Sequence, residues 1–165
     1  MKFFRLEEKS RSRPAEAFSG LGGLYAAGRW NSLGRRVVYV SQSLALASLE
    51  KLVHAHSLQA LTGLVYFEVQ VPDHLVEEAK HLPANWHADP AQPSSQTFGN
   101  RWLSEQRSPA LLVPSAVIPI EHNCILNPLH PDFTLDWIGR PQPFHYDPRI
   151  KAVYETAVAA KRRSR

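Results

Sequence analysis

The sequence is poor in cysteine and has no long apolar run, and both shortages exclude classes of protein. Cys124 is the single cysteine among 165 residues, which excludes an internal disulfide and suits a reducing compartment. No apolar run reaches about 18 residues, the length that a membrane-spanning helix needs. Met1 to Arg5 leads into charged residues rather than an apolar signal core, so we expect a cytoplasmic protein.

Several short enzyme motifs are also missing. The chain has no HExxH or CxxC pattern, and its eight histidines lack the spacing of metal ligands, so we expect no bound metal. Ser19 to Gly23 is rich in glycine but lacks the Lys-Ser/Thr of a P-loop, which favours a turn. Ser115 stands in no GxSxG elbow, and Cys124 lies in an apolar, strand-like setting typical of an inert thiol.

The composition is otherwise that of an ordinary globular protein. Hydrophobic residues make up 44% and charged residues 21% of the 165 positions, so one domain with a real core is expected. The net charge of +4 favours anionic partners such as nucleotides, nucleic acid or an acidic protein, without choosing among them. Part of the excess lies in the tail Lys161 to Arg165, which is expected to be solvated.

Periodicity and turn residues predict a mixture of strands and helices. The predicted strands cover residues 3–6, 37–40, 63–71 and 110–113. The predicted helices cover residues 44–55, 97–106 and 147–162, with a short turn of helix over 75–79. Residues 7–14 are charged and predicted to be irregular, and residues 83–95 to be a long loop that Trp86 anchors to the core.

The stretch from Gly28 to His54 contains the most unusual polar residue, Glu50. A helix over 44–55, capped by the hydroxyls of Ser41 or Ser43, gives this glutamate four neighbours at helical spacing. The four are Leu46, Ala47, Val53 and His54, and all but His54 are apolar. A carboxylate that faces a core needs a partner. The pattern alone favours a border residue that reaches water or pairs with Lys51 or Arg35.

Three blocks of the sequence resemble the RES domain, a family named for an Arg, a Glu and a Ser. The blocks are Gly28-Arg29-Trp30-Asn31 with Val38-Tyr39-Val40-Ser41, then Ala47 to His54, then Leu112 to Pro119 with Asn123, Leu126-Asn127-Pro128 and His130-Pro131. By this resemblance the name-giving residues are Arg29, Glu50 and Ser115. The resemblance implies a RES domain over residues 1–150, followed by a helical extension with a basic tail over 151–165.

The resemblance also implies a fold and an activity. The fold would be α+β, with a split β-sheet cleft and flanking helices as in ADP-ribosyltransferases. The protein would be the toxin of a bacterial type II toxin–antitoxin pair that cleaves the nicotinamide–ribose bond of NAD. NAD would be its substrate and no cofactor would be required. The partner would be an antitoxin with a helix-turn-helix DNA-binding domain, and a homodimer is left open.

The implied site has a catalytic set, Arg29, Glu50 and Ser115, and an NAD-binding set, Arg29, Tyr39, Ser41 and Asn127. A carboxylate such as Glu50 can stabilise the oxocarbenium-like centre that bond cleavage produces. The guanidinium fork of Arg29 suits a pyrophosphate, and the Tyr39 ring can stack on nicotinamide or adenine. Ser115 would fix a ribose hydroxyl or orient Glu50, while Arg11 or Arg13 would add a phosphate contact.

Two other functions fit the same sequence. The basic charge and Arg35-Arg36 suit a nucleic-acid-binding or RNA-cleaving protein. An inactive interaction module that keeps the fold is the second alternative. The sequence also leaves open whether water, phosphate or a protein accepts the ADP-ribose.

Overall fold

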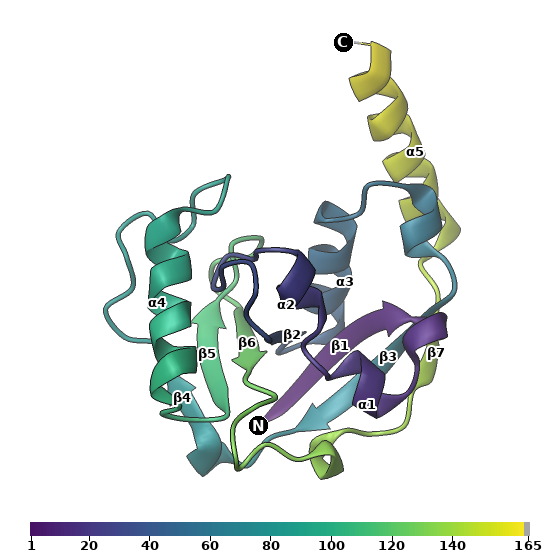
Figure 1. Cartoon of the computed structure of the whole chain (residues 1–165). Helices are drawn as coiled ribbons and strands as arrows, with labels where there is room; N and C mark the ends of the chain where they lie inside the picture. Colours follow the sequence, from purple (N-terminus) through teal and green to yellow (C-terminus); the bar gives the residue numbers. More distant parts are fainter. Residues whose placement is uncertain (164–165) are drawn as a thin grey trace.

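A mixed seven-stranded sheet in the order β4-β5-β6-β2-β1-β3-β7 forms the centre of the protein (Figure 1). The computed structural model describes residues 1–163 and the side chains of residues 1–156. The strands are β1 (Lys2–Glu8), β2 (Val38–Ser41), β3 (Leu64–Gln70), β4 (Val76–Glu78), β5 (Ala110–Pro114), β6 (His122–Leu126) and β7 (Gln142–Phe144). The helices are α1 (Pro14–Ala17), α2 (Gly22–Tyr25), α3 (Leu44–Val53), α4 (Pro93–Glu105) and α5 (Pro148–Arg163).

The sheet is split between β1 and β2. These strands pair only where Phe4 faces Ser41, whereas β1 pairs with β3 along all 7 of its residues. On its other side β2 pairs with β6 over its whole length. The two halves of the sheet therefore meet at one point and diverge beyond it, which confirms the α+β fold with a split sheet that the resemblance implied.

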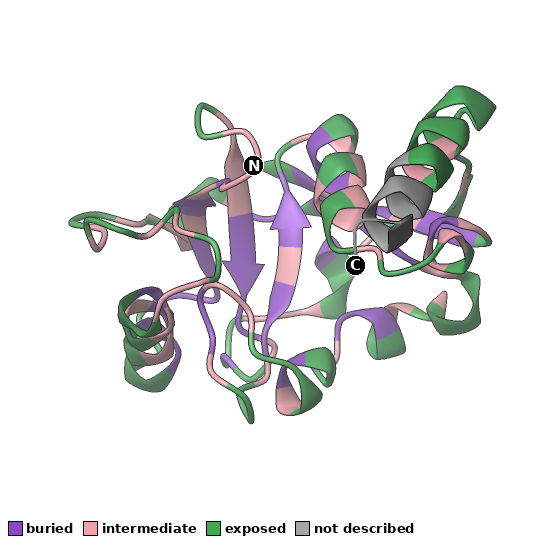
Figure 2. Cartoon of the chain, turned by 90° about the horizontal axis from the view of Figure 1, so that it is seen from above, coloured by how far each residue is buried: buried purple, intermediate pink, exposed green. Residues whose placement is uncertain are grey.

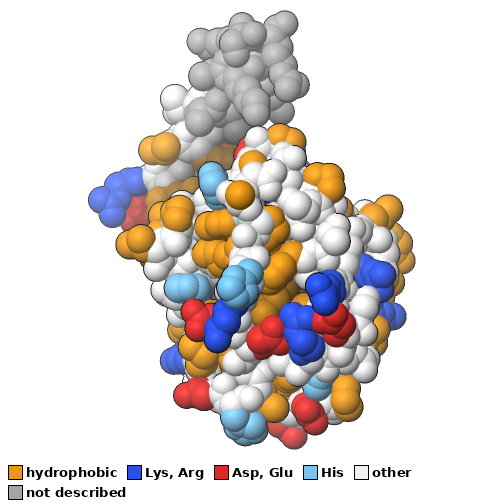
Figure 3. Space-filling model, turned by 90° about the vertical axis from the view of Figure 1, so that its left-hand side faces the viewer, with side chains coloured by type: hydrophobic (Ala, Val, Ile, Leu, Met, Phe, Trp, Pro, Cys, Tyr) orange, Lys and Arg blue, Asp and Glu red, His pale blue; other side chains and the backbone are white. Residues whose placement is uncertain are grey.

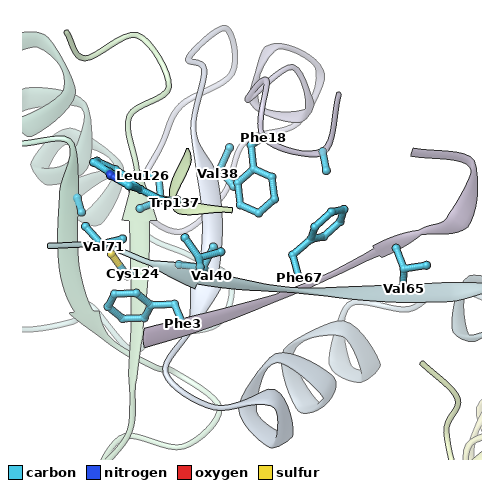
Figure 4. Packing of buried hydrophobic residues seen from close by; sticks show 13 residues of the cluster. Phe3, Phe18, Val38, Val40, Val65, Phe67, Val71, Cys124, Leu126 and Trp137 are labelled. Atoms are coloured by element: carbon cyan, nitrogen blue, oxygen red, sulfur yellow. The ribbon is translucent and has the colours of Figure 1, made fainter. Parts of the chain in front are cut away.

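One face of the sheet carries an apolar core that spans both halves (Figure 4). Val38 and Val40 of β2 and Phe67 of β3 point into it, and the Phe18 ring packs edge-on against Phe67 at a centroid distance of 5.4 Å. The inward face predicted for the strand over 63–71 is thereby confirmed. On the other face of β3, Leu64 is buried in a second cluster with Ala47 of α3, while Tyr66 and Glu68 are half-buried and Gln70 is exposed.

Two helices divide the opposite face of the sheet between them. Helix α4 packs through Trp102 onto Leu111 of β5, while α3 packs through Ala47 onto the β1–β3 half. Residues that face each other across antiparallel strands point to the same side of a sheet. Tyr39 and Ser41 of β2 therefore lie on this face, in the strip between the two helices. Seen from above, the central strands are buried and the outer sides of the helices are exposed (Figure 2).

Helix α3 has the predicted start and an earlier end. The hydroxyl of Ser43 accepts a hydrogen bond from the N–H of Leu46 at 3.0 Å, which confirms a serine cap. The helix ends at Val53, and the predicted apolar stripe is only half right, because Leu46 is buried while Leu49 and Val53 are exposed. Helix α3 packs on β1 and β2 with one side only, and Leu49 and Val53 lie on its exposed outer side.

The segment after β3 is a strand where the sequence predicted a short turn of helix. Asp73–Leu75 forms a 3-10 turn, and Val76–Glu78 forms β4, which pairs parallel with β5. Pairing at the sheet edge and packing of Val76 on the core outweigh the local preference. The next helix begins at Pro93 rather than residue 97, because proline suits the first helical position.

Helix α5 confirms the last predicted helix. The Asp147 side chain accepts from the N–H of Arg149 at 2.8 Å, and the Tyr154 hydroxyl donates to the Ala55 carbonyl at 2.7 Å. Ile150 and Val153, which share one apolar stripe of this helix with Tyr154, are exposed. The fourth stripe residue, Ala157, and the basic tail from Lys161 lie outside the described side chains.

The predicted irregular segment over 7–14 is wrong at its start, because Glu7 and Glu8 complete β1. Glu7 is only 6% exposed, and its carboxylate pairs with Arg5 at 2.8 Å and Arg11 at 3.4 Å. Burial by itself raises the pKa of Glu7, but the charge of Arg5, the N–H of Glu8 and the charge of Arg11 together hold that pKa below its usual value. The two arginines thus allow a charged residue inside the sheet.

Replacing Glu7 by glutamine should lower the free energy of unfolding by about 3 kcal/mol at pH 7, because Arg5 loses its buried counter-charge. A lowered folded-state pKa means that Glu7 stabilises the fold above its unfolded-state pKa of 4.5. That stability is lost as the pH falls through the folded-state value. Urea unfolding of the wild-type protein and the Glu7→Gln variant should be measured at pH 7 and at about pH 3. The difference between their free energies of unfolding should be smaller at the acid pH.

The matched control is Glu8→Gln, whose side chain is 45% exposed, and it should change stability by less than about 0.5 kcal/mol. An equal loss for Glu7→Gln at both pH values would contradict the ion-pair explanation.

Candidate functional site

Three elements far apart in the sequence bring Glu50 and its partners together. The Glu50 Oε1 atom on α3 accepts hydrogen bonds from Ser115 Oγ at 2.8 Å and from Asn123 Nδ2 at 2.5 Å. Ser115 directly follows β5 and Asn123 lies in β6. The ion pairs with Lys51 or Arg35 that the pattern favoured are wrong. The basic side chain near this carboxylate is His54, with Nε2 at 3.8 Å from Glu50 Oε2.

A tight turn after β5 fixes the direction of the Ser115 hydroxyl. Ser115 is fully buried, and its Oγ accepts from the N–H groups of Val117 at 3.0 Å and Ile118 at 3.1 Å. Its own N–H donates to the Glu121 carbonyl at 2.9 Å. Two incoming N–H groups leave the hydroxyl proton free to point at Glu50. Of the two roles considered for Ser115, these contacts are those of a residue that orients Glu50.

Tyr39 stands on the same face of the sheet and is half-buried. Its hydroxyl donates to Asn31 Oδ1 at 2.7 Å and accepts from the Trp30 N–H at 3.1 Å. Burial raises the pKa of Tyr39 far above its usual value, with the Trp30 N–H and the charge of Arg29 opposing and that of Glu50 adding, so the phenol stays neutral. A Cβ at Gly28 would stand 2.5 Å from the Tyr39 hydroxyl and from Asn31 Oδ1, so a side chain there would displace this hydrogen-bonded pair.

Arg29 is anchored by one of its terminal nitrogens. Its Nη1 donates to the carbonyls of Trp86 at 2.6 Å and Ala88 at 2.7 Å. Trp86 in turn stacks on Trp30, with ring centroids 6.2 Å apart, which confirms the predicted anchor of this loop. Within the described part of the chain, Nε and Nη2 of Arg29 make no hydrogen bond, so the rest of the fork is available to an anion.

A hollow of about 550 Å³ opens where β1 and β2 diverge. Arg5 and Glu7 of β1 and Tyr39 of β2 form two of its walls, and the glycine segment 20–23 and Arg11 also line it. The glycine-rich stretch therefore lies at the rim of this hollow, and Gly22–Tyr25 forms the short helix α2 where the sequence favoured a turn. Arg11 lines the hollow, whereas Arg13 does not.

Gly20 shows why this rim needs glycine. Its φ is +69°, and an added Cβ would stand 2.8 Å from the Pro128 side chain and from the Val37 backbone. Pro128 belongs to the Asn127-Pro128 turn, so the glycine rim is packed directly against the end of the third family block.

The remaining two residues of the implied NAD-binding set are buried. Ser41 is 5% exposed, and its hydroxyl donates to Asn123 Oδ1 at 2.7 Å, which joins it to the Glu50 network. Asn127 is 3% exposed, and its Oδ1 accepts from the Leu129 N–H at 3.1 Å. Asn127 lies four residues beyond Asn123 along β6, roughly 13 Å away. Its contacts are those of a turn residue behind the glycine rim.

Sequence reasoning assigned no role to two residues of this site, Asn31 and Asn123. Both stand in the blocks that resemble the family, so their positions were visible, but their partners were not. Asn31 holds the Tyr39 hydroxyl, and Asn123 holds both Glu50 and Ser41.

No group of three or more His, Cys, Asp or Glu side chains that could hold a metal ion occurs among the described residues. In the same part of the chain no helix is long and apolar enough to cross a membrane. On the face that α4 and β4 form, acidic and basic side chains alternate around an apolar area rather than gather into a basic patch (Figure 3). This face therefore gives no support to the nucleic-acid alternative.

The split α+β sheet agrees with the fold that the resemblance to the RES domain implied. The profile of the RES domain matches residues 2–147, and the chain belongs to the RES domain family.

Individual relatives extend over most of the chain. It is 37% identical over 153 residues to the Prs ADP-ribosylating toxin of Sphingobium sp. (strain YBL2), a match that covers 90% of this chain and 95% of that protein. It is 36% identical over 140 residues to Toxin Res of Yersinia enterocolitica, covering 83% and 92%.

A solved structure shares the fold. The crystal structure of the M. tuberculosis MbcT–MbcA toxin–antitoxin complex contains a chain that superimposes with a TM-score of 0.65 and 16% identity. The match covers 94% of this chain and 87% of that one.

Proposed function

We propose that this protein is the toxin of a type II toxin–antitoxin pair and that it cleaves the nicotinamide–ribose bond of NAD. The observation that supports the proposal most strongly is the Glu50 carboxylate, which two neutral donors, Ser115 and Asn123, hold by one oxygen. The name of one relative, an ADP-ribosylating toxin, supports chemistry on NAD, and the name Toxin Res of another supports the role of a toxin.

The chemistry follows from the charges that develop as the bond breaks. The bond between C1′ of the ribose and the nicotinamide nitrogen breaks, and its electron pair leaves with nicotinamide, which departs neutral. The positive charge left on C1′ and the ring oxygen is stabilised by Glu50. An oxygen of water, phosphate or a protein then forms the new bond to C1′. No metal or other cofactor is needed, because the leaving group is already activated by its cationic ring.

The other residues bind and orient the substrate. The free nitrogens of the Arg29 fork suit the pyrophosphate, which carries two negative charges. The neutral Tyr39 ring offers a stacking surface at the wall of the hollow. Ser41 and Asn127 support the site without contacting NAD, since their side chains are buried. We place the protein in the cytoplasm, where NAD is present.

The test is to incubate the purified protein with NAD and to measure nicotinamide and the ADP-ribose product. Release of nicotinamide should proceed unchanged with excess EDTA. We also propose that the RES domain covers residues 1–150 and that 151–165 is an extension, so a protein that ends at Ala160 should keep full turnover. Turnover that EDTA abolishes and zinc or magnesium restores would refute the mechanism. A protein that binds NAD without releasing nicotinamide would favour the inactive module.

The proposed partner is an antitoxin with a helix-turn-helix DNA-binding domain. If its C-terminal part covers the cleft, adding the product of the neighbouring gene to the NAD assay should stop nicotinamide release at a one-to-one ratio. The two proteins should elute together from gel filtration as a stable complex. Undiminished turnover in that complex would contradict a partner that blocks the cleft.

A further inference from the structure

We infer that Asn123, itself oriented by Ser41, is a positioning residue that aims the Glu50 carboxylate, and that Glu50 Oε2 is the oxygen that meets the substrate. This inference rests on the proposed function and deepens it. It concerns Asn123, which the family name does not include, and it gives Ser41 a task other than contact with NAD.

The contacts of the carboxylate are one-sided. Asn123 Nδ2 and Ser115 Oγ both donate to Oε1, at 2.5 Å and 2.8 Å. Among the described residues none donates a hydrogen bond to Oε2, and the basic group nearest to it, His54 Nε2 at 3.8 Å, belongs to a side chain that is 80% exposed. Two donors on one oxygen fix both the direction and the plane of the carboxylate. The lone pairs of Oε2 stay available to a substrate.

Asn123 can present its N–H to Glu50 because its other end is already occupied. An amide side chain has an acceptor end and a donor end, and a flip exchanges them. The Ser41 hydroxyl donates to Asn123 Oδ1 at 2.7 Å, which directs Nδ2 toward the carboxylate. Ser41 and Asn123 are direct cross-strand partners on β2 and β6, so the register of the sheet sets their distance. The chain Ser41–Asn123–Glu50 therefore runs in one direction across three elements.

The neutrality of both donors fits the proposed chemistry. A lysine or arginine in the place of Asn123 would hold the carboxylate more strongly, but its charge would oppose a cationic centre at C1′. An amide and a hydroxyl fix the geometry and leave the negative charge of Glu50 for the reaction.

The first arm of the test is Asn123→Leu, which keeps the approximate volume and removes the donor. The kcat for nicotinamide release should fall by about 10- to 100-fold, because a misplaced catalytic group loses rate on this scale. The KM for NAD should stay within about 2-fold of the wild-type value, since Asn123 acts through Glu50 and does not contact NAD. In a protein that already carries Glu50→Gln, adding Asn123→Leu should change kcat by less than about 2-fold.

The second arm keeps the inference testable if Asn123→Leu fails to fold. Ser41→Ala leaves the amide free to turn, so kcat should fall by about 3- to 10-fold, as expected for one lost hydrogen bond. The matched control is Ser108→Ala, a similarly buried hydroxyl that binds Trp102 and the Ala110 carbonyl at the other end of β5. It should lose stability and keep the wild-type kcat.

Each result decides between explanations. If the wild-type protein turns over NAD, three results would overturn the inference. The first is a wild-type kcat in Asn123→Leu or in Ser41→Ala, and the second is a raised KM with kcat unchanged. The third is a full effect of Asn123→Leu when it is added to Glu50→Gln. A wild-type protein that releases no nicotinamide would instead remove the proposed function, and the inference with it.

Discussion

Glu50→Gln should lower NAD turnover by roughly 10²- to 10⁴-fold while NAD still binds. The substitution keeps the shape of the side chain and an oxygen that can accept from Ser115 and Asn123, and it removes only the charge. If that charge stabilises an oxocarbenium-like centre, the loss falls on kcat. The glutamate side chain is 22% exposed and its bound oxygen keeps its donors, so the melting temperature should change by less than about 2 °C.

Melting temperature and turnover are best measured on the same sample. The matched control is Glu155→Gln, an exposed glutamate of α5, which should leave both quantities unchanged. Retained turnover with a lowered melting temperature would make Glu50 a structural partner of Ser115 and Asn123. It would also remove most of the case for this enzyme.

Arg29→Ala should lower kcat/KM for NAD, mainly through a raised KM. The expected loss corresponds to roughly 2–4 kcal/mol of transition-state stabilisation. The reason is the loss of the free nitrogens that suit the pyrophosphate. Because Nη1 also holds the carbonyls of Trp86 and Ala88, the variant will loosen that loop as well. Arg29→Lys should share most of the defect, since an ammonium cannot hold two carbonyls and a pyrophosphate in one plane.

The control for Arg29 is Arg101→Ala, an exposed arginine of α4 that pairs with Glu105 at 2.7 Å. It should keep the wild-type KM. Steady-state kinetics and thermal melting together separate binding from loop anchoring. A wild-type KM with a lowered melting temperature in Arg29→Ala would leave this residue as a loop anchor only.

Much of the fold was predictable, because its signals are local. The β-branched run before Ser41 predicted β2, and the serines after it predicted the start of α3, where Ser43 is the cap. Elements at the edges were less predictable. Residues 75–79 look helical when taken alone, and only the neighbouring β5 makes β4 of them.

The candidate site was predictable as a set of residues and only in part as a set of contacts. Arg29, Tyr39, Glu50 and Ser115 were each named, and a Ser115 that orients Glu50 was one of two roles considered. The helical pattern alone, however, favoured Lys51 or Arg35 as partners, and Asn123 was not named. The actual partners, Ser115 and Asn123, lie 65 and 73 positions further along the chain. A helical neighbour list reaches only four residues in either direction, so it cannot include them.

The sequence by itself determined the class of this protein. Its single cysteine and missing metal motifs excluded disulfide and zinc scaffolds, and its three blocks pointed to the RES domain family. The tertiary structure alone decided how the polar residues are satisfied. Glu7 can be buried because β1 and the following turn bring two arginines to it, and Asn123 reaches Glu50 because β6 pairs with β2 in one register. Buried polar groups need partners, and long-range pairing chooses which partners they find.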